Sequence, residues 1–320
     1  MTDREWLERA LELAERGRGR TAPNPVVGAV LVRDGQAVGE GWHERAGGPH
    51  AEIVALEAAG ERARGATLYA TLEPCAQHGR TPPCAEALVA AGVARVVAAV
   101  GDPNPETNGA GFARLRAAGV EVELPGGELE WRARVQNEAF RLWVTDHRPF
   151  VLYKAAVTLD GRVTVPGSRW VTGEESRRRV HELRARMDAA AVGMGTVRVD
   201  EPQLTARDVG AERQPRRLAF GSGPLPAGTE LELRTGPLEE ELRRLAAEGV
   251  QSLLLEGGPT LATAFLRAGF VDKLMLFVAP TLSGAGPRWL GELPEPVTLL
   301  APTTEQVGED LLITAYLREP

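Results

Sequence analysis

The stretch GPHAEIVALEAAGERARGATLYATLEPCAQHGRTPPC, residues 48–84, decides how the first half of this 320-residue chain folds. It contains His50, Glu52 and the only two cysteines of the chain, Cys75 and Cys84. One imidazole and two thiolates supply the three protein ligands of a catalytic zinc site, which keeps its fourth position for water. Glu52 is then free to move protons. We predict a catalytic zinc site with His50, Cys75 and Cys84 as metal ligands and Glu52 as the catalytic acid and base.

The pattern around these residues predicts helices that alternate with buried strands. Residues 50–59 and 84–91 have the composition of helices, and residues 66–72 have that of a buried strand. Pro74 suits the first turn of a helix, so we expect the thiolate of Cys75 to be favoured by a helix N-terminus. The proline-rich insertion between the cysteines should bulge outward and form a pocket wall.

A structural zinc site, or two inert buried cysteines, is the alternative interpretation. A structural site is normally closed by a fourth cysteine or histidine. The chain has no third cysteine, and the spare histidines nearby are His43 and His78. This shortage of ligands favours the catalytic interpretation.

The chain is expected to form two different α/β domains, 1–146 and 147–320. Thr2 and Glu5 form a capping box that opens a first helix, and Asp34-Gly35 predicts a hairpin turn. One helix is expected over 129–144, and the pattern then resets to a new series of strands. The Gly- and Pro-rich stretch 221–237 is expected to be a loop.

Composition narrows the possible partners. The net charge of −7 disfavours binding to nucleic acid, and the 43% hydrophobic and 25% charged residues are typical of a globular protein. No apolar run is long enough to span a membrane, and charged residues interrupt the N-terminus where a signal peptide would be apolar. Two cysteines do not form a disulfide framework. We expect a cytoplasmic protein that acts on a small molecule.

Several longer motifs make the chain similar to the bifunctional deaminase–reductases of riboflavin biosynthesis, and together they cover nearly all of it. The spacing of eight residues between the cysteines is typical of that family, although Gln77 stands where the family commonly has histidine. In the first half the motifs are Thr21-Ala22-Pro23-Asn24-Pro25-x-Val27-Gly28, Gly48-Pro49-His50-Ala51-Glu52, Thr71-Leu72-Glu73-Pro74-Cys75, His78-Gly79-Arg80-Thr81-Pro82-Pro83-Cys84 and Asp102-Pro103-Asn104-Pro105. In the second half they are Lys154-x-Ala156-x-Thr158-x-Asp160-Gly161, Ser168-x-Trp170-x-Thr172, Asp200-x-Pro202-x-Leu204-Thr205 and Glu256-Gly257-Gly258-Pro259-Thr260-Leu261.

The resemblance implies two folds and two reactions. A cytidine-deaminase-like three-layer domain would use Zn²⁺ to remove the 2-amino group of 2,5-diamino-6-ribosylamino-4(3H)-pyrimidinone 5′-phosphate. A dihydrofolate-reductase-like domain would then use NADPH to reduce the ribosyl group to ribityl. The resemblance also implies a homo-oligomer.

The resemblance implies further site residues. Asp200 is a second catalytic residue, the proton source for reduction. The substrate-binding residues that the resemblance implies are Asn24, Ser168, Arg184, Leu204, Arg207 and Glu256. In addition, we expect His78 and Arg80, in the insertion between the cysteines, to meet the 5′-phosphate, because arginine is suited to bidentate contact with it. The NADPH-binding residues are Lys154, Trp170, Thr196, Asp200, Ser222, Gly258, Pro259, Thr260, Leu261, Ala262, Thr263 and Ala264.

Other interpretations stay open at this stage. The glycine turn before Pro259 follows a strand and precedes a helix, where it can hold an anion, but it lacks the G-x-G-x-x-G pattern of a Rossmann domain. Arg80 and Arg184 can equally be solvated charges, and Trp170 can be a core residue. The alternative function is a single-activity zinc deaminase with a C-terminal binding module.

Overall fold

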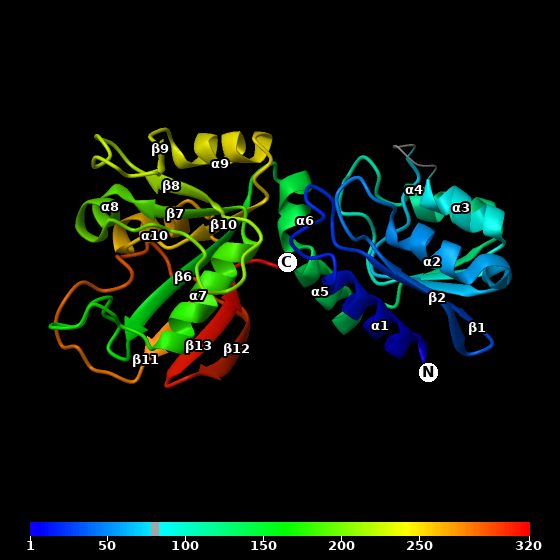
Figure 1. The fold of residues 1–320 in the computed structure, drawn as a ribbon, viewed down its shortest axis with the longest axis horizontal. Helices are drawn as coiled ribbons and strands as arrows, with labels where there is room; N and C mark the ends of the chain where they lie inside the picture. Colours follow the sequence, from blue (N-terminus) through cyan, green and yellow to red (C-terminus); the bar gives the residue numbers. More distant parts are fainter. Residues whose placement is uncertain (78–82) are drawn as a thin grey trace. The chain divides into compact units, whose positions relative to one another are not determined.

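The computed structural model describes residues 1–77 and 83–320, which separate into two compact units, Met1–Asp146 and His147–Pro320. Each unit is a sheet with helices on both faces, as the alternation of predicted helices and strands requires (Figure 1). None of the helices in the described residues combines the length and apolar character needed to cross a bilayer.

The first unit is built on a five-stranded sheet in the order β2-β1-β3-β4-β5. The predicted turn at Asp34-Gly35 joins β1 to β2 as an antiparallel hairpin, whereas β3, β4 and β5 are parallel. The strands are β1 (Gly28–Arg33), β2 (Gln36–Trp42), β3 (Thr67–Ala70), β4 (Arg95–Ala98) and β5 (Glu121–Glu123).

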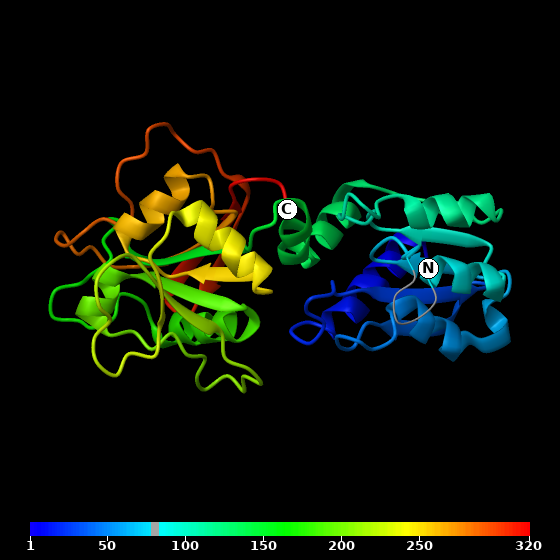
Figure 2. The same ribbon diagram turned by 90° about the horizontal axis from the view of Figure 1, so that it is seen from above.

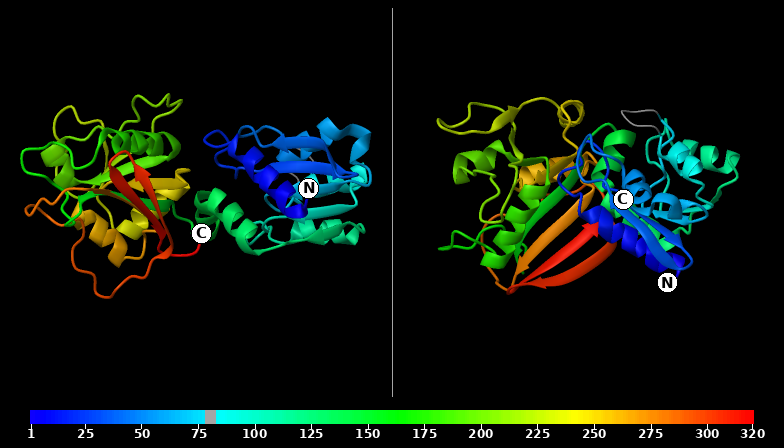
Figure 3. Two further views of the ribbon diagram at one scale, coloured as in Figure 1. Left: turned by 90° about the horizontal axis from the view of Figure 1, so that it is seen from below. Right: turned by 45° about the vertical axis from the view of Figure 1, so that its right-hand side comes forward.

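Helices cover both faces of this sheet (Figures 1 and 3). The helices α2, α3 and α4 connect strands that run in the same direction, so right-handed crossovers place these three helices in one layer. The helices α1 and α5 pack together, and α1 lies on β1 and its neighbours. The predicted capping box at Thr2 and Glu5 is present. The helices are α1 (Asp3–Glu15), α2 (Ala51–Ala59), α3 (Cys84–Ala91), α4 (Ala110–Ala117), α5 (Gly127–Gln136) and α6 (Glu138–Thr145), with a short 3-10 turn at Gly60–Ala63.

The second unit contains an eight-stranded mixed sheet in the order β12-β13-β11-β6-β10-β7-β8-β9. Six neighbouring strands from β11 to β9 are parallel, and β13 and β12 add an antiparallel edge. The strands are β6 (Phe150–Thr158), β7 (Ala189–Gly193), β8 (Arg216–Phe220), β9 (Glu232–Arg234), β10 (Ser252–Leu255), β11 (Lys273–Ala279), β12 (Leu300–Val307) and β13 (Asp310–Tyr316).

The helices of the second unit divide between the two faces of the sheet (Figure 2). The strand order advances from β6 through β7 to β8 and then returns through β10 to β11, so right-handed crossovers place α7 and α8 on one face and α9 and α10 on the other. This reversal creates a topological switch point between β7 and β10, where open α/β sheets bind ligands at the carboxyl ends of the strands. The helices are α7 (Glu174–Arg186), α8 (Met194–Asp200), α9 (Leu238–Ala247) and α10 (Pro259–Arg267).

Two predictions about local structure were wrong. The single helix expected over 129–144 is broken at Asn137, whose buried side chain accepts a hydrogen bond from the backbone N–H of Val26 and donates one to its carbonyl, each at 2.9 Å. The stretch 221–237 is not entirely loop, because β9 extends the edge of the large sheet there. Both differences come from contacts between segments far apart in the sequence.

Candidate functional site

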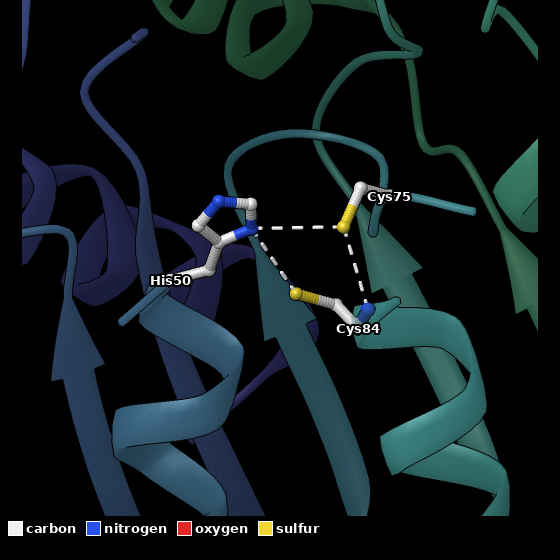
Figure 4. Close-up of side chains that lie close together, drawn as sticks. All are labelled: His50, Cys75 and Cys84. Carbon is white, nitrogen blue, oxygen red and sulfur yellow. Dashed lines mark hydrogen bonds between the residues drawn. The ribbon is translucent and has the colours of Figure 1, made fainter. Parts of the chain in front are cut away.

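The two cysteines and His50 meet at one point in the first unit (Figure 4). His50 is the N-cap residue of α2, Cys84 is the first residue of α3, and Cys75 lies in the loop after β3. The Nδ1 atom of His50 lies 3.6 Å from the Sγ atom of Cys75 and 3.3 Å from that of Cys84. The three atoms lie within 4.8 Å of one another, and no other histidine, cysteine or carboxylate of residues 1–77 and 83–320 joins them.

These separations fit a single zinc ion. With Zn–S bonds of about 2.3 Å and a Zn–N bond of about 2.0 Å at tetrahedral angles, neighbouring sulfur and nitrogen ligands stand about 3.5 Å apart. The observed sulfur–nitrogen distances of 3.6 and 3.3 Å match this value. A three-ligand set leaves the fourth tetrahedral position open, as a catalytic site requires.

The two thiols oppose each other's ionisation. A hydrogen bond with Cys84, together with one to His50, lowers the pKa of Cys75 to about 4. The same contact with Cys75, together with burial, raises the pKa of Cys84, because a second negative charge beside the first is unfavourable. A divalent cation between the sulfurs removes that repulsion and favours both thiolates.

The helix N-terminus beside Cys75 is not the predicted one. Cys75 lies in an irregular segment, so Pro74 does not open a helix. The backbone N–H of Cys84, at the start of α3, instead donates to the Sγ atom of Cys75 at 3.3 Å. The thiolate of Cys75 is therefore stabilised by a helix that begins nine residues later.

Glu52 lies beside this cluster, in the first turn of α2, and is only 3% exposed. Burial raises the pKa of its carboxyl to about 7. A carboxyl with a pKa near neutrality can both accept and donate a proton at physiological pH. The predicted proton carrier and the predicted metal ligands therefore lie together.

His43 orients Asn24 in this site, a role that the sequence did not indicate. Its Nδ1 atom lies 2.9 Å from the carbonyl oxygen of Pro49, which can only accept, so Nδ1 carries the proton of the neutral ring. Its Nε2 atom then accepts from the side-chain amide of Asn24 at 3.1 Å. This fixes the amide of Asn24 with its NH₂ group toward His43, leaving its oxygen as an acceptor for a ligand. A histidine seven residues before His50 is the only sequence signal for this arrangement.

Glu73 joins the Cys75 segment to the neighbouring loop. Its buried carboxylate accepts backbone hydrogen bonds from Asp102, Gly109 and Phe112 at 3.0–3.1 Å, the last two at the start of α4. These bonds connect two of the quoted motifs, which are far apart in sequence. His78 and Arg80, predicted to bind substrate, lie outside the described residues, and their roles stay predictions.

The second unit has a charged cluster at the switch-point side of β6 and β10. Lys154 lies on β6 and Glu256 directly follows β10. Burial lowers the pKa of Lys154, and the nearby carboxylate of Glu256 opposes that effect. Among the described residues the Lys154 ammonium has no hydrogen-bond acceptor, and its nearest aromatic neighbour is Phe277, at 5.8 Å from the ring centre. The ammonium is thus available to a ligand.

Arg184 belongs to this cluster but is held by the protein itself. Its guanidinium forms a bidentate ion pair with Glu256 at 2.6 and 2.8 Å and donates to the carbonyl oxygen of Thr205 at 3.2 Å. The side chains of this pair are 15% and 9% exposed. Arg184 is therefore neither a solvated charge nor a free phosphate ligand.

The predicted cofactor-binding turn contains a close contact between two helices. A Cβ atom at Gly258, the N-cap residue of α10, would lie 3.4 Å from the Oγ1 atom of Thr196 in α8. On α10, however, Ala262 faces the core and the Oγ1 atom of Thr263 accepts from the backbone of Gly291 at 2.9 Å. Because successive helical residues point in different directions, the predicted run cannot present every side chain to one ligand. Its other members are Pro259, Thr260, Leu261 and Ala264.

Other predicted residues of this unit lie on its surface. The ring of Trp170 is 52% exposed between the guanidinium groups of Arg169 and Arg177, so it is not a core residue. Leu204, by contrast, is buried, and its backbone has a positive φ of 53°. The side chains of four more predicted residues are exposed: Ser168, Asp200, Arg207 and Ser222.

Comparison with known proteins agrees with both halves of this description. Residues 1–100 match the cytidine and deoxycytidylate deaminase zinc-binding region, and residues 149–313 match the RibD C-terminal domain. The chain is 41% identical to the riboflavin biosynthesis protein RibD of Aquifex aeolicus, with 97% of both chains covered. It is also 41% identical to RibD of Escherichia coli, with 92% of both covered.

Solved structures extend the likeness to the fold. Acinetobacter baumannii RibD superposes with a TM-score of 0.88 at 37% identity over 98% of both chains. The Thermotoga maritima diaminohydroxyphosphoribosylaminopyrimidine deaminase/5-amino-6-(5-phosphoribosylamino)uracil reductase has a TM-score of 0.85 at 35% identity, again over 98% of both. The predicted cytidine-deaminase-like and dihydrofolate-reductase-like folds are thereby confirmed. The chain belongs to the RibD family, the bifunctional deaminase–reductases of riboflavin biosynthesis.

Proposed function

We propose that the first unit deaminates 2,5-diamino-6-ribosylamino-4(3H)-pyrimidinone 5′-phosphate with His50, Cys75 and Cys84 as zinc ligands and Glu52 as proton carrier. The observation that carries this proposal is the triangle of ligand atoms, whose sulfur–nitrogen edges of 3.6 and 3.3 Å suit one tetrahedral ion. A zinc ion held there lowers the pKa of water and supplies a nucleophile at neutral pH.

Glu52 moves the protons of this reaction. It takes a proton from the attacking water and delivers it to a ring nitrogen next to the carbon that carries the amino group. It next takes the remaining proton of the new hydroxyl group and gives it to the amine, so that the C–N bond breaks, ammonia leaves and a carbonyl forms. Its raised pKa of about 7 suits both steps, and its burial keeps bulk water from competing for the proton. The side-chain oxygen of Asn24, oriented by His43, accepts from an N–H group of the substrate.

The second unit reduces the ribosyl group with NADPH bound at the switch point between β7 and β10. When bound, NADPH supplies the hydride. Thr196 and the start of α10 are suited to its pyrophosphate, because exposed backbone N–H groups at a helix N-terminus favour an anion. The free ammonium of Lys154 faces the substrate side of this site.

Two residues have finer roles in this proposal than the resemblance implied. Arg184 positions Glu256 and the Thr205 backbone through its three hydrogen bonds, and Arg207 is the freer cation for the substrate phosphate. Asp200 donates the proton that accompanies hydride transfer. We also propose that the protein is cytoplasmic and forms a homo-oligomer. Light scattering of the purified chain tests the oligomeric state.

Replacing Glu52 by glutamine tests the deaminase assignment. Glu52→Gln should keep one zinc ion per chain and lower ammonia release by about 10²–10⁴-fold, while NADPH oxidation with the deaminated substrate is unchanged. Glu57→Gln, on an exposed position of the same helix, is the matched control and should behave as the unmodified chain. Persistence of ammonia release in Glu52→Gln would end this assignment. Following ammonia and nicotinamide absorbance together also separates the two activities from a single-activity deaminase.

A further inference from the structure

The β8 strand of the second unit ends in a tight turn that packs on α8. Gly221 and Gly223 have positive φ angles of 133° and 96° on either side of Ser222. Cβ atoms at these two positions would lie 3.1 Å from the Cγ atom of Met194 and 2.8 Å from the Nη2 atom of Arg198. Met194 and Arg198 are one helical turn apart, so the turn follows one face of α8. Positive φ angles of this size favour glycine at both positions.

Arg198 is anchored by the turn and retains free donors. Its Nη2 atom donates to the carbonyl oxygen of Ser222 at 2.9 Å. In the described part of the chain no carboxylate lies within ion-pair distance of this guanidinium. The arginines of the neighbouring strands differ, because Arg216, Arg217 and Arg234 all pair with glutamates. The fold therefore leaves one oriented, unneutralised cation at the carboxyl end of β8.

The position of Arg198 relative to the switch point indicates which part of a bound dinucleotide it would contact. The strands lie in the order β6-β10-β7-β8, with the Lys154 and Glu256 cluster on the β6 side of the switch point and Arg198 on the β8 side. A dinucleotide with its pyrophosphate between β7 and β10 must extend its nicotinamide toward the substrate cluster. Its adenosine half must then extend over the end of β8.

We infer that Arg198, held by the Ser222 carbonyl, binds the 2′-phosphate of the adenosine ribose and makes the reductase unit select NADPH over NADH. This inference rests on the reductase site proposed above and adds the residue that distinguishes the two nucleotides. A guanidinium with several free donors is suited to a phosphate, which accepts two parallel hydrogen bonds from its planar fork. NADH has a hydroxyl at the same position and gains nothing from the charge.

The experiment compares both nucleotides in Arg198→Gln, Arg198→Lys and the unmodified full-length chain. Arg198→Gln should lower kcat/KM for NADPH about ten- to hundredfold and leave that for NADH within about twofold. Arg198→Lys should lose less, because it keeps the charge but not the bidentate fork. Arg178→Gln, an exposed arginine on α7 that pairs with Glu182, is the control and should change neither value.

The outcomes separate failure of this inference from failure of the proposed function. Absence of reduction with either nucleotide in the unmodified chain contradicts the reductase site itself. An equal loss with NADPH and NADH in Arg198→Gln, or no loss with either, overturns the role of Arg198 while the site stands. Dissociation constants from nicotinamide fluorescence give the same comparison without turnover, so slow use of NADH does not prevent the test. An unchanged Tm in calorimetry of the full chain shows that the second unit of each variant is folded.

Discussion

Replacing Arg184 by methionine tests whether this residue is a ligand contact or a structural partner. The substitution removes the bidentate pair at 2.6 and 2.8 Å and the bond to Thr205, and leaves the carboxylate of Glu256 largely buried. Breaking one side of a buried ion pair typically destabilises a protein by about 3–5 kcal/mol. Lys154 still attracts the orphaned carboxylate, so we expect the lower end, about 3 kcal/mol. For a unit of this size that is a decrease in Tm of about 6–12 °C.

Calorimetry of the full chain measures this effect, and Arg178→Met is its control. Arg178 lies on the same helix in an exposed i,i+4 pair with Glu182, so its loss should reduce stability by about 0.5 kcal/mol or less. In a double-mutant cycle, Arg184→Met with Glu256→Gln should be less destabilising than the sum of the single changes by about 1 kcal/mol or more. An unchanged Tm together with a raised KM for the phosphorylated substrate would refute the structural role. If the losses of stability in Arg184→Met and Glu256→Gln were additive in the double variant, the ion pair between these two residues would be refuted.

Three further predictions concern the metal, the deaminase pocket and pH. Chelation of zinc should abolish ammonia release but not NADPH oxidation, and added zinc should restore ammonia release. The Cys75→Ser variant should fail to retain the metal. Deamination by the metal-free chain would contradict the ligand set. His43→Leu should raise the KM of deamination about tenfold with zinc retained, because the Asn24 amide loses its fixed orientation. An unchanged KM would show that the orientation of this amide does not matter for substrate binding. Burial alone would raise the pKa of Glu256, but Arg184 and Lys154 hold it below 4.5 in the folded chain. The stabilisation by the Arg184–Glu256 ion pair is therefore present above about pH 4.5, and it is lost as the pH falls through the lower pKa of Glu256 in the folded state. The Tm difference between the unmodified chain and Arg184→Met should therefore shrink as the pH falls below about 4.5, and a constant difference would contradict the pKa shift.

The sequence by itself determined the chemistry of the first unit. His50, Cys75 and Cys84 are too few to close a structural zinc site, and the periodic pattern placed His50 and Cys84 at helix starts, where the structure has them. These features depend on residue type and local periodicity, which a sequence carries directly. The alternation of strands and helices likewise indicated the α/β class of both units.

Only the tertiary structure decided which groups are partners. It showed that the thiolate of Cys75 is supported by the N–H of Cys84, that Asn137 breaks a helix to pair with Val26, and that Arg184 is neutralised by Glu256 while Arg198 is not. The physical reason is distance along the chain. Burial, ion pairing and the orientation of an amide are set by neighbours that lie from 9 to 111 residues away in these examples, and no local pattern records them. Residue types identified the available chemical groups, and packing decided which of them remain free to act.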